Sequence, residues 1–310
     1  MKKKWLIALS LSVLFYACSK DNTNERPDTR QVQIPFKVSV AEFIKKVQQL
    51  PSASGRMAPS SIFAKDSTLN TAVSDIYFFA FKNNGDRISY IHQRSTDADF
   101  GVISDSLPSG ECTIALIASS DSLIISDELR NAGINLNADY NNNTILAAFP
   151  DIFYKKMQIT VGPDTTANNF SLSLERIMAS LEVNITDAPA IRADSNITVN
   201  VRSENTYFEI FSAWAYTGIP MQLKIPQRTQ QLFSELIMNT SEEIRIDINY
   251  PDKVTNTMLT KTIGPITLTK NTKTILTGSL YPAIPPVTNV NSGFSVSINN
   301  IWNPAQTIDF

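Results

Sequence analysis

Short runs of alternating apolar and polar residues follow one another through the second half of this chain. They are NITVNVR (196–202), MQLKI (221–225), EIRIDINY (243–250), MLTKTIGPITL (258–268), KTILTGSLY (273–281) and GFSVSIN (293–299). A period of two buries one face of a β-strand, and evenly spaced short strands are typical of an antiparallel sandwich. No helices alternate with these runs, as a doubly wound fold requires. The chain is therefore expected to be mainly β.

The first half carries the same signals. VQIPFKVSV (32–40) alternates strictly, and SDIYFFAF and RISYIH flank an Asn84-Gly85 pair that suits a tight hairpin. Two further strands are expected in SLPSGECTIALIAS (106–119) and KMQITV (156–161). The period changes to that of a short amphipathic helix in AEFIKKVQQL (41–50), and residues 126–143 are expected to form a helical turn and a long loop.

The amino end has the pattern of an export signal. Lys2, Lys3 and Lys4 precede an apolar stretch, Trp5–Ala17, that is too short for a permanent membrane span. It ends in FYAC, which resembles the lipobox of bacterial lipoproteins. Residues 1–17 are therefore expected to be a lipoprotein signal peptide and Cys18 the site of lipid attachment, followed by a polar tether over residues 18–30. The alternative is a plain signal peptide followed by a chance cysteine.

Charge limits the partners of the exported chain. The formal net charge is −2, and loss of the three lysines makes it more negative. A mildly acidic chain argues against nucleic acid as a partner. It also offers no basic patch for anionic lipid, so contact with the outer membrane would depend on the acyl chains.

The length after residue 17 favours two domains, because single cores stop growing at about 250–300 residues. NFSLSLERIMASLEVNITD (169–187) is interpreted as the passage between them. The expected domains are residues 31–168 and 169–310.

Residues for catalysis or metal binding are scarce. His92 is the single histidine, and Cys112 is the one cysteine besides Cys18, so neither a Cys/His pair with a recognisable signature nor a zinc site is indicated. Cys112 reads as a small core hydrophobe. No glycine-rich phosphate loop or calcium loop is present, although two carboxylates of a glycosidase would leave no sequence signature. We expect no enzyme activity and no cofactor.

Several segments resemble the FimB-type anchor family of the fimbrillin superfamily, the type V pilus components. They are the lipobox with its tether, VSDIYFFAFKNNGDRISY (73–90), LPSGECTIALIAS (107–119), LSLERIMASLEVNITD (172–187), KTILTGSLY (273–281) and FSVSINNIWNPAQTIDF (294–310). Cys112 stands where the family more often has an aromatic residue. The resemblance implies two tandem transthyretin-like antiparallel β-sandwich domains with minor helix, no catalysis, and a lipid-anchored place on the outer membrane or fimbrium.

The resemblance also implies assembly by β-strand addition with a fimbrial stalk subunit. In stalk subunits an arginine-specific protease removes the first strand. Here Arg30 and Arg56 are candidate protease-accessible sites, but cleavage there would free the body from a lipid on Cys18. We therefore expect the chain to keep its first strand and to offer its C-terminal segment as strand donor. The candidate donor residues are Phe294, Val296, Ile298, Trp302 and Phe310.

Two alternatives remain open at this point. Residues 293–310 could simply form the last core strand. The chain could also be a glycan-binding surface lipoprotein of a nutrient-uptake complex, which would need exposed aromatic side chains. Trp214 and Tyr216 are candidates for that role, but core packing is the expected place for both.

Overall fold

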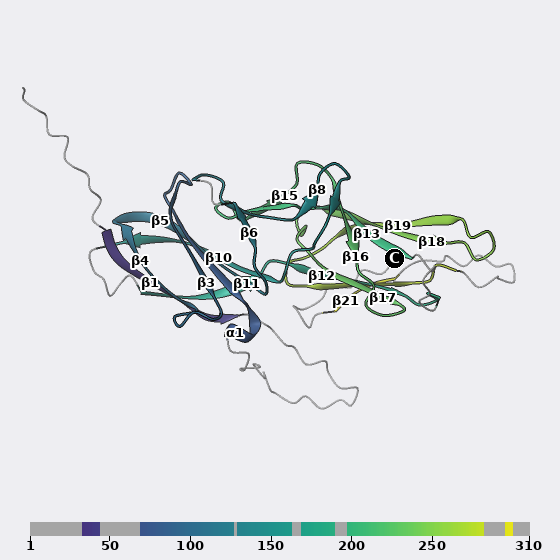
Figure 1. Ribbon diagram of the computed structural model, residues 1–310, viewed down its shortest axis with the longest axis horizontal. Coiled ribbons are helices and arrows are strands. Elements are labelled where there is room, and N and C mark those ends of the chain that lie inside the picture. The colour runs from purple at the N-terminus through teal and green to yellow at the C-terminus, as the bar shows by residue number, and fades with distance from the viewer. Residues whose placement is uncertain are drawn as a thin grey trace, which may run out of the picture. The chain divides into compact units, whose positions relative to one another are not determined.

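The computed structural model describes residues 33–43, 69–126, 129–162, 169–189, 197–281 and 295–299. Strands dominate these residues, and the helix among them is the single turn α1 (Leu69–Ala72). The expectation of a mainly β chain with antiparallel sheets is confirmed (Figure 1).

Seven strands form the first sheet. Their order is β3 (Arg87–Arg94), β2 (Asp75–Phe81), β5 (Gly110–Ser119), β10 (Ile152–Val161), β11 (Asn169–Arg176), β1 (Gln33–Phe43) and β4 (Val102–Pro108). All neighbours run antiparallel except β1 and β11, which are parallel. Asn84 and Gly85 turn the chain from β2 into β3 as the sequence predicts, and the φ angle of Gly85 is +85°.

The central strands of this sheet are buried on both faces. Every residue of β2 is buried, so that Phe78 points into one core cluster while Phe79 points into another. The Phe78 cluster draws almost all its buried side chains from β2, β4, β5, β10 and β11. The seven-stranded sheet therefore curls around a core of its own.

Two later sheets share the second core cluster. One has the order β17 (Leu232–Ile237), β12 (Ala179–Ile185), β20 (Lys273–Gly278) and β21 (Ser295–Asn299). The other has the order β19 (Met258–Thr267), β18 (Glu243–Pro251), β13 (Thr198–Glu204), β16 (Met221–Ile225), β9 (Thr144–Ile145) and β8 (Ala138–Asp139). Val183 of β12 and Ile246 of β18 belong to the same cluster, so both sheets bury a face in it. A transthyretin-like assignment of these sheets stays a prediction.

A further four-stranded sheet has the order β15 (Trp214–Tyr216), β14 (Tyr207–Glu209), β7 (Gly133–Asn135) and β6 (Ile124–Ser126). Its strands β6 and β7 lie partly within residues 126–143, where a helical turn and loop were expected. That expectation is wrong for the described part. The strands are only three residues long, and β6 pairs with β7, whose other partner β14 lies far along the chain. No local pattern therefore marks them.

The expected helix over residues 41–50 is wrong at its start. Strand β1 continues through Phe43 because it pairs with β11 up to Leu174, while residues 44–50 lie outside the described residues. The chain passes from the seven-stranded sheet to the β12 sheet at Ile177 and Met178. The domain boundary after residue 168 stays a prediction.

Arg176 stands at that passage. Its Nε and Nη2 donate to the two carboxylate oxygens of Asp151, each at 2.7 Å, and Nη1 donates to Oδ1 of Asn271 at 3.3 Å. The guanidinium also lies 5.0 Å from the ring centre of Phe153, a cation–π distance. Arg176 is largely buried. It therefore joins the end of β11, the start of β10 and the turn that leads into β20.

Replacing Arg176 by Lys should destabilise the protein by about 3 kcal/mol, because a lysine cannot make the paired contact and leaves Asp151 poorly matched in a mostly buried site. The free energy of unfolding in urea measures the effect. The matched control is Arg130→Lys, because Arg130 pairs with Asp86 while its side chain is 70% exposed. That substitution should leave the free energy of unfolding nearly unchanged, because exposed ion pairs contribute little. Equal effects of the two substitutions would contradict the role given to Arg176.

Candidate functional site

Most of the predicted functional residues lie outside the described residues. These are Cys18, Arg30, Arg56, Phe294, Trp302 and Phe310. Val296 and Ile298 lie in β21. The lipid attachment, cleavage and strand-donor roles stay predictions.

Strand β21 is the last strand of its sheet. It runs antiparallel to β20, with Val296 opposite Leu276 and Ile298 opposite Thr274. Among the described strands, none pairs with its other side. A strand in this position presents a row of backbone N–H and C=O groups that can accept another strand.

Strand β1 lies inside the first sheet. It pairs with β11 on one side and with β4 on the other, so that Val38 is flanked by Phe170 and Ile103. Removal of such a strand would uncover two ladders of backbone hydrogen-bonding groups, which is the groove that strand addition needs.

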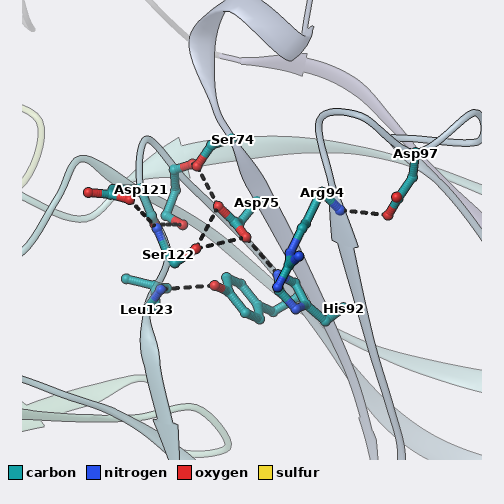
Figure 2. A network of polar contacts seen from close by, with 10 residues as sticks. Ser74, Asp75, His92, Arg94, Asp97, Asp121, Ser122 and Leu123 are labelled. Atoms are coloured by element: carbon teal, nitrogen blue, oxygen red, sulfur yellow. Dashed lines mark hydrogen bonds and ion pairs between the residues drawn. The ribbon is translucent and has the colours of Figure 1, made fainter.

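A polar network ties β2, β3 and the loop before β6 together. Figure 2 shows Asp75 at its centre, with contacts from Ser74, His92 and Ser122. The Nε2 atom of His92 lies 2.7 Å from Oδ1 of Asp75, and the His92 ring stacks on Tyr77 at 4.4 Å. Burial pushes the pKa of Asp75 upward, but these hydrogen bonds outweigh it and the net shift is downward.

The order of groups in this network differs from that of a catalytic triad. Both serines contact the carboxylate of Asp75 rather than His92, whereas nucleophilic catalysis needs the hydroxyl on the histidine. Cys112 is buried in the first core, as predicted, and burial raises the pKa of its thiol to about 11. Such a thiol stays protonated and unreactive at neutral pH. The network's contacts hold strands together.

The described residues contain no group of three or more His, Cys, Asp or Glu side chains that could hold a metal ion. Within the same part of the chain, no helix is long and apolar enough to cross a membrane.

Trp214 and Tyr216 are exposed, and the expectation that they pack in the core is wrong. Their exposed fractions are 51% and 43%. Both lie on β15, with Ala215 between them turned toward the core. The run FSAWAY alternates, but the pattern cannot tell which of its two faces meets the interior.

Glu204 is a buried carboxylate that sequence reasoning missed. A β-bulge at the end of β13, with Ser203 at φ +68°, precedes it. Its Oε1 atom accepts backbone N–H groups of Asn205, Met238 and Asn239 at 2.9–3.0 Å, and among the described residues Oε2 has no partner. Burial raises its pKa to about 8 in spite of these bonds. No sequence signal distinguishes this glutamate from a surface one.

The described residues thus form a β-sheet protein, and the unpaired edge of β21 offers backbone N–H and C=O groups for a further strand. Residues 60–303 match the family of fimbrillin-A associated anchor proteins Mfa1 and Mfa2. This match spans well over half of the chain, so the chain belongs to that family of fimbrial proteins. The resemblance to fimbrial anchors is confirmed, and the family associates its members with the fimbrium or cell surface. Its members are structural fimbrial proteins rather than enzymes.

Of three similar solved structures, the two with TM-scores above 0.5 support the fold. A candidate polysaccharide-binding protein from Bacteroides thetaiotaomicron is 10% identical, with a TM-score of 0.55 over 87% of this chain and 96% of that one. A candidate adhesin from Bacteroides ovatus is 11% identical, with a TM-score of 0.53 over 86% and 94%. The fimbrial anchor protein Mfa2 from Porphyromonas gingivalis is 11% identical, with a TM-score of 0.49 over 86% and 97%. No curated protein sequence matches the chain.

The buried Glu204 predicts a pH-dependent stability. Because its pKa is raised in the folded state, the stabilising protonated form is fully present below its unfolded value of 4.5 and is lost as the pH rises through about 8. The free energy of unfolding should therefore fall by an amount on the order of 3 kcal/mol between pH 5 and pH 9. Glu204→Gln keeps the acceptor atom and should flatten this dependence.

Urea unfolding at pH 5, 7 and 9 measures the effect. The control is Glu243→Gln, which changes an exposed carboxylate on β18 and should follow the wild-type slope. A Glu204→Gln profile as steep as that of the wild type would show that another group governs the pH dependence.

Proposed function

We propose that this chain is a lipid-anchored fimbrial subunit, either the basal anchor or an accessory component, that assembles by β-strand addition. The observation that carries the proposal is the match of residues 60–303 to the fimbrillin-A associated anchor family. The membership supports a role in a fimbrium. The sequence around Cys18 and the positions of β1 and β21 support the finer parts.

Lipid attachment at Cys18 is supported by the sequence before it. The basic residues Lys2–Lys4, the short apolar stretch and FYAC together suit export and acylation. Each buried methylene contributes about 0.8 kcal/mol, so two or three acyl chains would make a durable anchor in the outer membrane.

Retention of the first strand is supported by the position of β1. Its two neighbours β11 and β4 both bond to it, so the groove that a foreign strand would enter is already filled. A subunit with a lipid at its amino end and a filled groove cannot receive a strand there. It is therefore suited to end a fibre at the membrane.

The other end of the chain is then the natural contact with the stalk. Strand β21 ends the sheet that contains β20, and one of its sides is unpaired among the described strands. In this proposal the alternating residues Phe294, Val296 and Ile298, together with Trp302 and Phe310, contribute to a strand pairing with the stalk subunit. Backbone hydrogen bonds would supply affinity and alternate side chains specificity.

Deletion of residues 293–310 in the native host tests the proposal. The truncated protein should stay folded and bound to the outer membrane, because its lipid and most of its core remain, while fibres detach into the medium. Electron microscopy of cells and immunoblots of the medium measure attachment. A shorter deletion, of residues 300–310 alone, keeps β21 and so distinguishes its contribution from that of the residues that follow it. Fibres of normal number on cells with the longer deletion would overturn the strand-donor role.

Cys18→Ser tests the anchor independently. The altered protein should leave the outer-membrane fraction, and fibres should be shed, because the acyl chains hold the base. Cys112→Ser is the matched control, since it changes the other cysteine, buried in the first core. An unchanged membrane fraction for Cys18→Ser would contradict lipid attachment at this residue.

A further inference from the structure

The four-stranded sheet β15-β14-β7-β6 has one face turned away from the core. The inward row across it is Ala215, Phe208, Ile134 and Ile125, all of which pack in the second core cluster. Directly opposed residues of antiparallel strands share a face, and alternate rows point to opposite faces. The rows on either side of the core-facing row therefore point outward. One is Tyr216, Tyr207, Asn135 and Ile124, and the other is Trp214, Glu209, Gly133 and Ser126.

Three aromatic rings gather on this outward face. Trp214 and Tyr216 are about half exposed, and Tyr216 meets Tyr207 edge-on with ring centres 5.1 Å apart. The ring of Tyr207 lies across Gly133, where an added Cβ would come within 2.1 Å of its Cζ atom. The hydroxyl of Tyr207 donates to the carbonyl of Asn131. The absence of a side chain at Gly133 thus lets an aromatic ring lie on the sheet.

Hydrogen-bonding groups lie among the rings. Asn135 is next to Tyr207 in the same row, and Glu209 is directly opposite Trp214. The Glu209 carboxylate accepts a hydrogen bond from Ser212 at 2.8 Å, which holds it near the turn between β14 and β15. Glu209 is the only charged residue within the four strands.

The size of this face limits its occupant. Strands of three residues across four positions cover roughly 10 Å by 15 Å, an area several-fold below the roughly 800 Å² per partner of a stable protein interface. A ligand of a few rings fits the face better than a second protein. The ring centres of Tyr207 and Tyr216, 5.1 Å apart, are separated by about the length of one sugar unit.

We propose that the outward face of the β15-β14-β7-β6 sheet binds a neutral oligosaccharide. The C–H faces of sugar rings would stack on Trp214, Tyr216 and Tyr207, and their hydroxyls would bond to Asn135 and Glu209. A single carboxylate without a neighbouring cation on these strands accepts neutral hydroxyls but repels sulfated or uronic-acid polymers. This site goes beyond the anchoring function, because it lies on strands that the proposed stalk and membrane contacts do not use.

Isothermal titration of the full chain tests the proposal, with the protein held in a polyoxyethylene detergent that carries no sugar. The probes are hexasaccharides of mannan, xylan, β-glucan and galactan, with a galacturonic acid hexasaccharide as the anionic comparison. At least one neutral probe should bind, and the anionic probe should not. Trp214→Ala and Tyr216→Ala should each weaken binding at least about tenfold, as loss of a central aromatic contact does at other interfaces.

Two more variants sharpen the test. Gly133→Ala should weaken binding, because the added methyl group pushes the Tyr207 ring off the sheet. This variant keeps the Trp214 and Tyr216 side chains. Met258→Ala is the control, because Met258 is 54% exposed, close to the exposure of Trp214, but lies on β19 of another sheet. It should bind like the wild type, and Trp214→Ala and Met258→Ala should unfold at the wild-type temperature.

Failure of every neutral probe to bind the wild type would overturn the proposal. So would binding that survives both Trp214→Ala and Tyr216→Ala. Loss of stalk attachment in Trp214→Ala cells, with oligosaccharide binding unchanged, would make the face a protein contact and would also overturn it. The anchoring function is tested separately, by the number of fibres that remain on cells with Cys18→Ser or with the C-terminal deletion.

Discussion

The pairing of Arg176 with Asp151 is the contact on which the arrangement of the sheets depends. It lies where the chain leaves the seven-stranded sheet for the β12 sheet, and the same guanidinium reaches Asn271 in the turn before β20. Backbone bonds reinforce the connection, since the N–H of Asn271 donates to the carbonyl of Met178. Three segments distant in sequence thus meet at one planar cation, whose fork geometry a lysine cannot copy.

This member of a fimbrial family is built largely from paired strands. In the proposed function, strand pairing would also supply the means of attachment, while the same backbone ladders are a hazard when they are left open. In this chain β1 is enclosed by β11 and β4, while β21 ends its sheet among the described strands. One groove is therefore filled and one edge is available. In the function proposed above, that difference gives the fibre its direction away from a lipid at Cys18.

The unexpected exposure of Trp214 and the unexpected burial of Glu204 have a common origin. The alternation in the segment around Trp214 is correct as a strand pattern, yet the face with the larger aromatic residues points outward. Glu204 looks like a surface charge until the bulge at Ser203 turns it inward toward the N–H groups of Met238 and Asn239. A pattern of period two states that a strand has two faces, but the partner strands decide which face is covered. Those partners lie far away along the chain.

The sequence by itself determined the β class, the hairpin at Asn84-Gly85, the burial of Cys112 and the resemblance to fimbrial anchors, because each depends on local alternation, turn chemistry or a continuous motif. Only the tertiary structure decided that β6 and β7 join β14 in a sheet, that Arg176 binds Asp151, and that Trp214 and Tyr216 share an open face with Tyr207. These are contacts between residues distant in sequence. Their free energy depends on what packs against each side chain, and no local pattern records the packing.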